Sequence, residues 1–282
     1  MANRYWVGGG SSTNWAATSN TNWATTSGGA NNASVPTSAD AVIFDGVGAF
    51  ANGTSVIGAI ITVLSVTITS GFTGTINHSQ ALTIAGNLTL GANYTITGAG
   101  NISISANAVL TSNGKTWPNA LSLTGGTTKT FADSWNILGS FNVATPSTVT
   151  INSVLTSATI STTSTTAATF TGTAGWICTA FGANQTAAAT ITLQDGIEYI
   201  INGSLASSAS RVGTPVLFTS SSATLKAKIT LDEAATCTTN AFFTRIDASG
   251  GRPINTWNGT VTDCINVNRF TDTVVKTTAY TF

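Results

Sequence analysis

The residues that could perform acid–base chemistry are few, and four of the acidic ones fall in two close pairs. Asp195 is followed three positions later by Glu198, and Asp232 stands directly before Glu233. Hydrolysis of a glycosidic bond needs two carboxyl groups about 5 to 9.5 Å apart. Side chains at positions i and i+3 of a turn more often shape that turn through hydrogen bonds. Both pairs therefore favour turns, and catalysis is the alternative interpretation.

The single histidine and the three cysteines could in principle bind a metal or act in catalysis. His78 stands among Gly, Ser and Asn residues, which is typical of an exposed turn, and Cys178, Cys237 and Cys264 are far apart with no C-x-x-C pair. The number and the spacing of these side chains do not match the ligand sets of protein metal sites. We expect no catalytic, cofactor-binding or metal-binding residue, and hence no enzyme. The cysteines are interpreted as small buried side chains, with one disulfide and one free thiol as the alternative.

The charge of the chain excludes further classes of function. Ten basic and ten acidic residues cancel, and 7% of the 282 residues are charged, against about 25% in an ordinary soluble domain. A protein that binds nucleic acid or an anionic membrane needs a basic patch. Met1 to Gly10 lacks the apolar core of a signal peptide, and no run of about 18 apolar residues could span a membrane. We therefore expect neither nucleic acid nor membrane as a partner.

The polar residues indicate strands and turns. The chain has 54 Thr, 29 Ser and 24 Asn, but only two Glu, five Lys, five Arg and three Gln to cover the outer faces of helices. Threonine is β-branched and suits a pleated surface, while Asn and Gly suit tight turns. The composition therefore predicts an all-β fold with under about 10% helix.

Short alternating runs begin after Asp40. Each places apolar residues two positions apart with a hydroxyl residue between them, which is the period of a strand with one buried face. A Gly-Asn pair, which favours a turn, directly precedes two of the runs, at Gly86-Asn87 and Gly100-Asn101. We expect the apolar members of these runs to share one core, namely Ile68, Leu82, Ile84, Leu88, Leu90, Ile96, Ile102 and Ile104.

Strands of three to five residues without fixed hairpin spacing favour a parallel β-helix, also called a β-solenoid. At about 20 to 25 residues per coil, residues 40–155 would form roughly five coils. A β-sandwich or jelly roll is the alternative. The expected divisions are an N-terminal segment (1–39), a stacked β region (40–155), a Thr/Ser/Ala-rich linker or irregular crossing (156–173) and a second β region (174–282).

A block rich in Trp and Gly opens the chain, from Arg4 to Pro36. It contains Trp6, Trp15 and Trp23, and Asn14-Trp15-Ala16 is repeated eight residues later as Asn22-Trp23-Ala24. Tryptophans in a turn-rich segment can dock into pockets of a partner protein. They can also form a private cluster that caps the first coil. We favour docking as the role of these three residues.

Several segments resemble a type of structural protein encoded by tailed bacteriophages. At the N-terminus these are Arg4 to Gly9, the two Asn-Trp units, Ser27-Gly28-Gly29, Val35 to Asp40 and Val42 to Asp45. Near the C-terminus, Thr244 to Gly251 followed by Thr256 to Val261 is similar to a module of the same proteins. The resemblance covers both ends, about a third of the chain. It implies a virion protein such as a capsid decoration protein, head fibre, tail fibre or spike, and supplies no catalytic residue.

From the resemblance we expect a non-enzymatic structural protein located in the virion and exposed on the particle surface. Its expected partners are other virion proteins, the major capsid protein or tail proteins, and two further copies in a homotrimer, with a host surface glycan as a further candidate. One alternative is a carbohydrate-binding adhesin that uses Trp117, Trp135 or Trp257 as sugar platforms. Another is a tailspike that cleaves polysaccharide.

Overall fold

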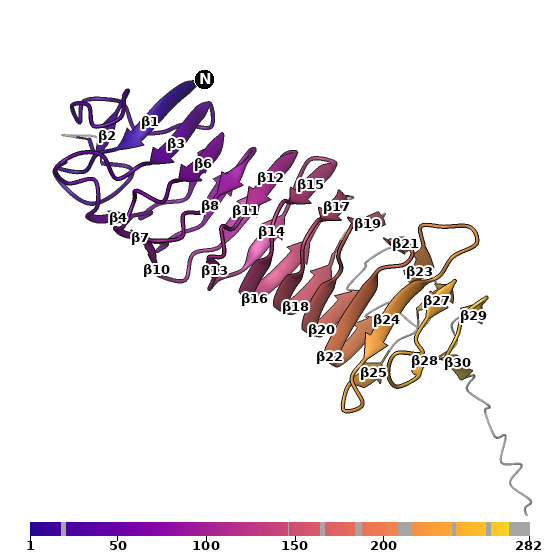
Figure 1. Cartoon of the computed structure of the whole chain (residues 1–282). Coiled ribbons are helices and arrows are strands. Elements are labelled where there is room, and N and C mark those ends of the chain that lie inside the picture. The colour runs from indigo at the N-terminus through magenta and orange to yellow at the C-terminus, as the bar shows by residue number, and fades with distance from the viewer. Residues whose placement is uncertain are drawn as a thin grey trace, which may run out of the picture.

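The computed structural model describes residues 1–17, 21–145, 147–163, 167–183, 188–207, 216–238, 241–257 and 261–270. Within these ranges the chain consists of strands and turns, with no helix. Apart from one antiparallel pair at the N-terminus, the strands pair in parallel and stack along one axis (Figure 1). The fold is a parallel β-solenoid, which confirms the favoured fold class, and the sandwich alternative is not adopted.

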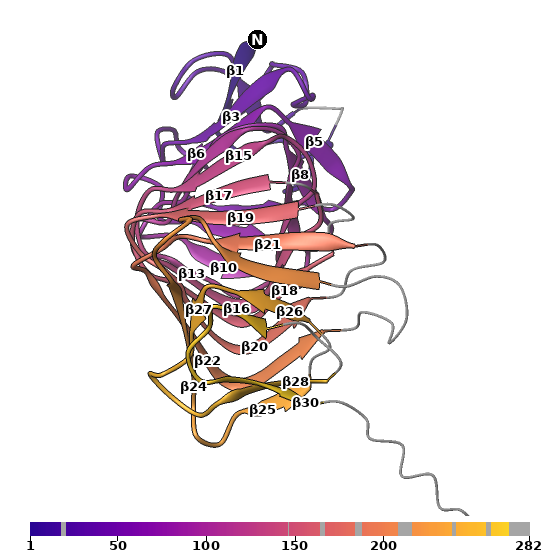
Figure 2. The same cartoon turned by 90° about the vertical axis from the view of Figure 1, so that its right-hand side faces the viewer.

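Two long sheets form the solenoid. The first sheet follows chain order except at its start, and in Figure 2 its strands β17, β19 and β21 lie one below the next. Its strands are, in order, β2 (Trp23–Ala24), β1 (Ala2–Trp6), β3 (Asp40–Phe44), β6 (Ser65–Ile68), β9 (Leu88–Thr89), β12 (Ala108–Thr111), β15 (Thr128–Phe131), β17 (Ser147–Ile151), β19 (Ala167–Gly172), β21 (Ala189–Leu193), β23 (Val216–Ser220), β26 (Phe242–Thr244) and β29 (Val261–Thr262).

The second sheet runs beside the first from coil to coil. Its strands are β5 (Ile61–Val63), β8 (Leu82–Ile84), β11 (Ile102–Ile104), β14 (Leu121–Leu123), β16 (Trp135–Val143), β18 (Leu155–Thr162), β20 (Trp176–Ala183), β22 (Glu198–Ser207), β24 (Ala227–Leu231) and β27 (Ile246–Asp247), with β13 (Thr116–Trp117) on β16 and β25 (Thr236–Thr238) on β22. Two small sheets complete the described part, β4 (Thr54–Val56), β7 (Thr75–Asn77) and β10 (Thr95–Thr97) in one and β28 (Ile254–Trp257) and β30 (Val267–Phe270) in the other.

The register between coils sets the length of the repeat. Along the first sheet, the successive register partners are Val42, Val66, Leu88, Leu110, Phe131 and Ile151. Each partner lies 20 to 24 residues after the one before it. This spacing confirms the coil length of about 20 to 25 residues predicted for residues 40–155. In a parallel stack of this kind, backbone N–H and C=O groups of a strand pair with the coils above and below.

Alternation within each strand fills the interior. In β8, Leu82 and Ile84 point inward and Thr83 lies between them at the surface. The register pairs Leu82 with Ile102 and Ile84 with Ile104 on β11, so like side chains stack along the axis. Of the eight apolar residues expected to share a core, seven are buried in one cluster. Ile96 is half-buried and packs against that cluster.

The cross-section of the coil changes along the axis. The first coils use three short strands each, as in β6, β7 and β8. From β16 onward one long strand pairs with both β13 and β14, and its register on β18 shifts between Ile137 and Ser140. Gly139 lies in this shift, where a Cβ atom would stand 2.5 Å from the carbonyl oxygen of Asn119. A glycine here lets the long strand bend against the coil below.

The linker or irregular crossing predicted for residues 156–173 is replaced by strands in the described part of that segment, and residues 164–166 lie outside the described residues. Residues in this segment belong to β18 and β19, which continue the second and the first sheet without interruption. Ile160 and Phe170 are fully buried in the common core. Small Thr, Ser and Ala residues weakened the apolar pattern, but the neighbouring coils supply the packing partners. In the described residues, the two predicted β regions are therefore one continuous solenoid.

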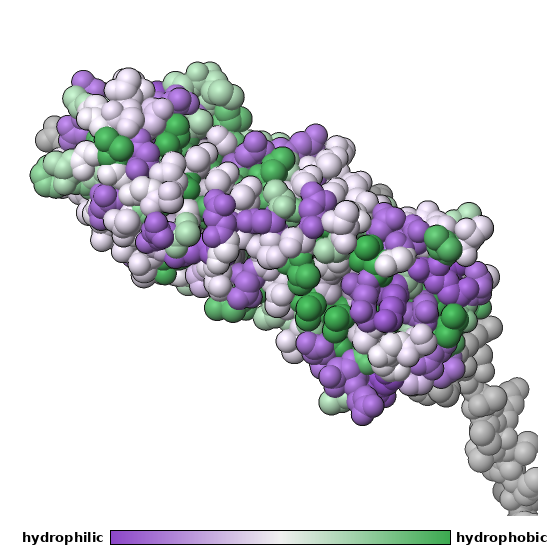
Figure 3. Space-filling model, viewed as in Figure 1, coloured by the Kyte–Doolittle hydropathy of each residue, from purple (hydrophilic) through white to green (hydrophobic). Residues whose placement is uncertain are grey.

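The face of the molecule seen in Figure 3 is weakly polar over most of its area. Figure 3 shows pale and hydrophilic residues over much of the visible face, with apolar residues in small separate groups. The larger exposed apolar side chains among the described residues are Met1, Val47, Phe50, Ile60, Val109, Leu138, Val154, Leu225 and Ile265. Hydroxyl and amide side chains thus take the role that charged residues have on most soluble proteins.

Candidate functional site

The predicted acidic pairs engage neighbouring residues of the solenoid. Asp195 accepts a hydrogen bond from Ser221 Oγ at 2.7 Å. Glu198 accepts one from Thr230 and forms an ion pair with Lys228, whose Nζ lies 3.0 Å from its Oε1. The hydrogen bonds from Thr230 and Lys228 lower the pKa of Glu198. A carboxyl group kept ionised in this way is the opposite of a general acid.

The second acidic pair lies in a surface turn. Asp232 Oδ1 accepts a hydrogen bond from the backbone N–H of Ala234 at 2.9 Å. Glu233 is exposed beside it. This hydrogen bond closes an Asx-type turn, and both acidic residues of the pair are exposed.

His78 is buried, not exposed as the sequence suggested. It follows β7, is 3% exposed, and its ring meets the ring of Trp117 edge-on with centroids 4.9 Å apart. Its Nδ1 has no hydrogen-bond partner among the described residues. Burial lowers the pKa of His78 to about 4, so the ring is neutral at pH 7. The Gly, Ser and Asn residues near His78 predicted an exposed turn. The residue is buried all the same, because residues of other coils, such as Trp117, pack against it.

The three cysteines are free thiols. Cys178 is buried, and burial raises the pKa of its thiol to about 12, which removes the reactive thiolate at pH 7. Cys237 and Cys264 are half-buried and donate to the backbone carbonyls of Asn255 and Thr262. Among the described residues no group of three or more His, Cys, Asp and Glu side chains could hold a metal ion.

The tryptophans of the N-terminal block lie inside the solenoid. Trp6, Trp15 and Trp23 are each at most 1% exposed and surround Phe44 of β3. Trp23 meets both Trp6 and Trp15 edge-on at 5.3 Å between centroids, and its Nε1 donates to the backbone oxygen of Trp15 at 3.0 Å. These side chains form an aromatic cap on the first coil. They are not exposed anchors, so the docking role predicted for the side chains themselves is wrong, and docking by the block as a whole stays a prediction.

Two of the tryptophans considered as sugar platforms are also buried. Trp117 and Trp135 are each 1% exposed, and their indole nitrogens donate to the backbone oxygens of Ala120 and Leu110. Trp257 belongs to β28, and its side chain lies outside the described part of the structure. Flat exposed rings for sugar binding are therefore not provided by Trp117 or Trp135.

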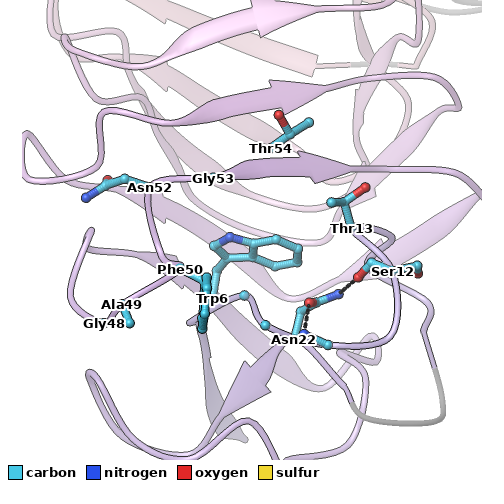
Figure 4. A pocket seen from close by; sticks show the side chains of 13 residues that line it. Trp6, Ser12, Thr13, Asn22, Gly48, Ala49, Phe50, Asn52, Gly53 and Thr54 are labelled. Carbon is cyan, nitrogen blue, oxygen red and sulfur yellow. Dashed lines mark hydrogen bonds between the residues drawn. The ribbon is translucent and has the colours of Figure 1, made fainter.

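An open pocket of about 560 Å³ lies at the N-terminal end of the solenoid, and we call it the N-terminal pocket. It is lined by Trp6, Gly8 to Gly10, Ser12, Thr13, Asn22, Gly48 to Phe50 and Asn52 to Thr54. Figure 4 shows Trp6 in its centre, with Phe50 on one side and Thr13, Ser12 and Asn22 on the other. Its volume lies within the range of small-molecule sites, about 300 to 1,000 Å³.

Asparagine side chains hold the two walls of the N-terminal pocket. Asn22 donates to the backbone oxygens of Ser12 and Asn14 and accepts from the N–H of Gly10 at 2.9 Å. Asn52 donates to the backbone oxygen of Gly46 and accepts from the N–H of Thr73 at 2.8 Å. These hydrogen bonds fix the shape of the pocket. Asn22 uses its carbonyl oxygen and two donations, whereas Asn52 makes one donation of the two that an amide can make.

The sequence did not predict this pocket. The pocket combines residues 6–22 with residues 48–54, which are brought together because β1 pairs in parallel with β3. The available signal was Gly8-Gly9-Gly10. Gly8 has a φ of +65°, and a Cβ there would stand 2.6 Å from the carbonyl oxygen of Phe50. Three successive glycines therefore marked a place where two backbone segments approach closely.

No protein-family model matches the chain, and no curated protein and no solved structure is significantly similar to it. None of the described residues lies in a helix that could span a lipid bilayer.

Proposed function

We propose that this protein is a non-enzymatic structural component of a bacteriophage virion, exposed on the particle surface as a decoration protein, fibre or spike. The proposal depends above all on one observation, the uninterrupted parallel stack from β1 to β29. In such a stack each coil pairs with its neighbours along the axis, which gives a stiff rod whose length follows from the number of coils. A rod of this kind is suited to projecting from a particle.

Two further observations support a role on the outside of a particle. The segments that resemble phage virion proteins coincide with structured elements, since Trp6, Trp23 and Phe44 form the aromatic cap. Because only 7% of the residues are charged, few surface ion pairs contribute to stability. Salt acts by screening such pairs, so it should have little effect on the stability of this protein. A protein exposed to changing environments benefits from both properties.

The proposed partners are other virion proteins, the major capsid protein or tail proteins, and further copies of this chain in a homotrimer. A lateral groove of about 270 Å³ supports contact between copies, since Val154, Ile177, Ile197 and Ile200 line it. Apolar residues in a groove on the side of a rod can be covered by a parallel neighbour.

The alternative functions have less support. A polysaccharide-cleaving tailspike requires two carboxyl groups that face one groove, whereas Asp195 and Glu198 are hydrogen-bonded to the next coil. An adhesin that uses Trp117 or Trp135 requires exposed rings, and both are buried.

Particle imaging tests the proposed function. An antibody raised against the purified chain should label intact particles in electron microscopy, and mass spectrometry of purified particles should detect the chain at a fixed stoichiometry. Absence of the chain from purified particles would contradict the proposal. Release of reducing sugar from host polysaccharide by the purified chain would instead support the tailspike alternative.

A further inference from the structure

The lining of the N-terminal pocket offers one buried N–H group that has no hydrogen-bond partner among the described residues, and two hydroxyl groups of exposed residues. The N–H group is the indole Nε1 of Trp6, which is buried. The two hydroxyls belong to Thr13, whose backbone oxygen accepts from the N–H of Val56, and to Thr54 of β4. A buried N–H without an acceptor costs about 1 to 3 kcal/mol. An oxygen atom from a ligand would remove that cost.

An exposed aromatic ring forms one wall of the N-terminal pocket. Phe50 is 66% exposed although it is one of the largest apolar side chains of the protein. Its ring lies against the backbone of Gly9, where a Cβ atom would stand 3.0 Å from Cδ2. The glycine lets the ring lie against the backbone, and the remainder of the ring is open to solvent.

Among the described residues, no ionisable side chain lines the N-terminal pocket. A charged ligand would therefore lose hydration without gaining a counter-charge, which is unfavourable. A purely apolar ligand would leave the Trp6 N–H and the two hydroxyls unpartnered. The lining instead matches a ligand that is neutral, rich in hydroxyl groups and apolar on one flat side.

We propose that the N-terminal pocket binds a neutral saccharide. One face of a pyranose ring, made of C–H groups, packs on Phe50, and its hydroxyls exchange hydrogen bonds with Thr13 and Thr54. The nitrogen of Trp6 lies beneath the surface, so the pocket wall opens slightly before a sugar oxygen accepts its hydrogen bond. The proposal goes beyond a structural role in a virion and depends only on the pocket.

The test uses the purified full chain labelled with ¹⁵N and titrated with neutral methyl hexopyranosides and their disaccharides. Methyl glucuronide serves as the charged comparator. We expect a saturable downfield shift of the assigned Trp6 indole N–H with a neutral sugar, and at least tenfold weaker binding of the glucuronide. No shift with any neutral sugar up to roughly 50 mM would overturn the proposal, because even a weak site has a Kd in the millimolar range.

Variants separate the pocket from unspecific binding. Phe50→Ala, and the double variant Thr13→Val with Thr54→Val, should each weaken binding by at least tenfold. Phe50→Tyr should retain it. Leu225→Ala is the matched control, because Leu225 is also a largely exposed apolar residue and lies outside the pocket. Since Phe50 is exposed, its truncation leaves the fold intact. Equal affinity of Phe50→Ala and the unaltered chain would contradict the assignment.

A protein partner in the pocket is the competing outcome. A photo-crosslinking amino acid at position 50 would then couple to another virion protein within assembled particles. Such a product would identify the pocket as a protein-docking site and overturn the saccharide proposal. The sugar titration is independent of the proposed virion location, since a chain absent from particles could still bind sugar in solution.

Discussion

At the scale of the residue, burial changes the protonation of the single histidine. His78 lies against Trp117 and lines a small interior cavity together with Tyr94. The Nδ1 of His78 and the hydroxyl of Tyr94 both lack a hydrogen-bond partner among the described residues. Both are polar groups kept in an apolar core. Desolvation lowers the pKa of His78 to about 4. The uncharged form is therefore the one that the folded protein accommodates.

This burial predicts a loss of stability in mild acid. Between pH 6.5 and pH 4 the unfolded chain binds a proton on His78 that the folded chain does not bind, so the free energy of unfolding falls as the pH falls. From pH 7 to pH 5 the expected loss is about 2 kcal/mol. Urea unfolding at both pH values measures it. Because the chain has one histidine, His78→Gln should remove most of the dependence, and an unchanged pH profile of that variant would refute this origin.

At the scale of the element, the stability of the strands depends on apolar side chains facing the core and polar side chains facing the solvent. Replacing Leu88 or Ile102 with Asp would bury an unpaired charge in the core and should lower the free energy of unfolding by more than about 4 kcal/mol, preventing soluble expression. Val109→Asp is the control, since Val109 points outward from β12. Circular dichroism and size-exclusion chromatography of the three variants test this. Normal folding of the Leu88 or Ile102 variant would show that the register is different.

The aromatic cap is a second element whose contribution can be measured. Trp23→Ala removes a fully buried ring and the hydrogen bond to the backbone of Trp15, so the free energy of unfolding should fall by about 3 to 5 kcal/mol. Leu225→Ala, at an exposed position, should change it by less than about 0.5 kcal/mol. Hydrogen exchange should show that the Trp23 variant opens first near β1 and β3. Uniform loss of protection along the whole chain would contradict a local capping role.

At the scale of the whole molecule, the first 36 residues close one end of the solenoid. Deleting Met1 to Pro36 would expose Phe44 and the free edge of β3, because β1 pairs with that strand. An uncovered edge and core favour aggregation. We therefore expect the truncated chain to aggregate, as judged by light scattering. A truncated chain that folds but no longer joins particles would instead establish the block as the attachment element.

The sequence determined the fold class and the length of the coil. Strand period two, recurring Gly-Asn pairs and the scarcity of helix-favouring polar residues are local properties, and they predicted a common core and coils of about 20 to 25 residues. The structure supplies the pairing itself, with Leu82 beside Ile102 and Leu88 beside Leu110 in the register. The candidate site was not predictable in the same way. The Gly8 to Gly10 run indicated a close backbone approach but not the segment at Phe50 that approaches it.

Only the tertiary structure decided which polar and aromatic residues are inside. Trp6, Trp15 and Trp23 lacked an alternating pattern, yet they are buried because they cover the end of the first coil. Lys129 is also buried, with its Nζ donating to the backbone oxygens of Gly125 and Gly126. Burial in a solenoid depends on the residues one coil above and one coil below. Those neighbours are about 20 residues away in sequence, beyond the reach of any local pattern.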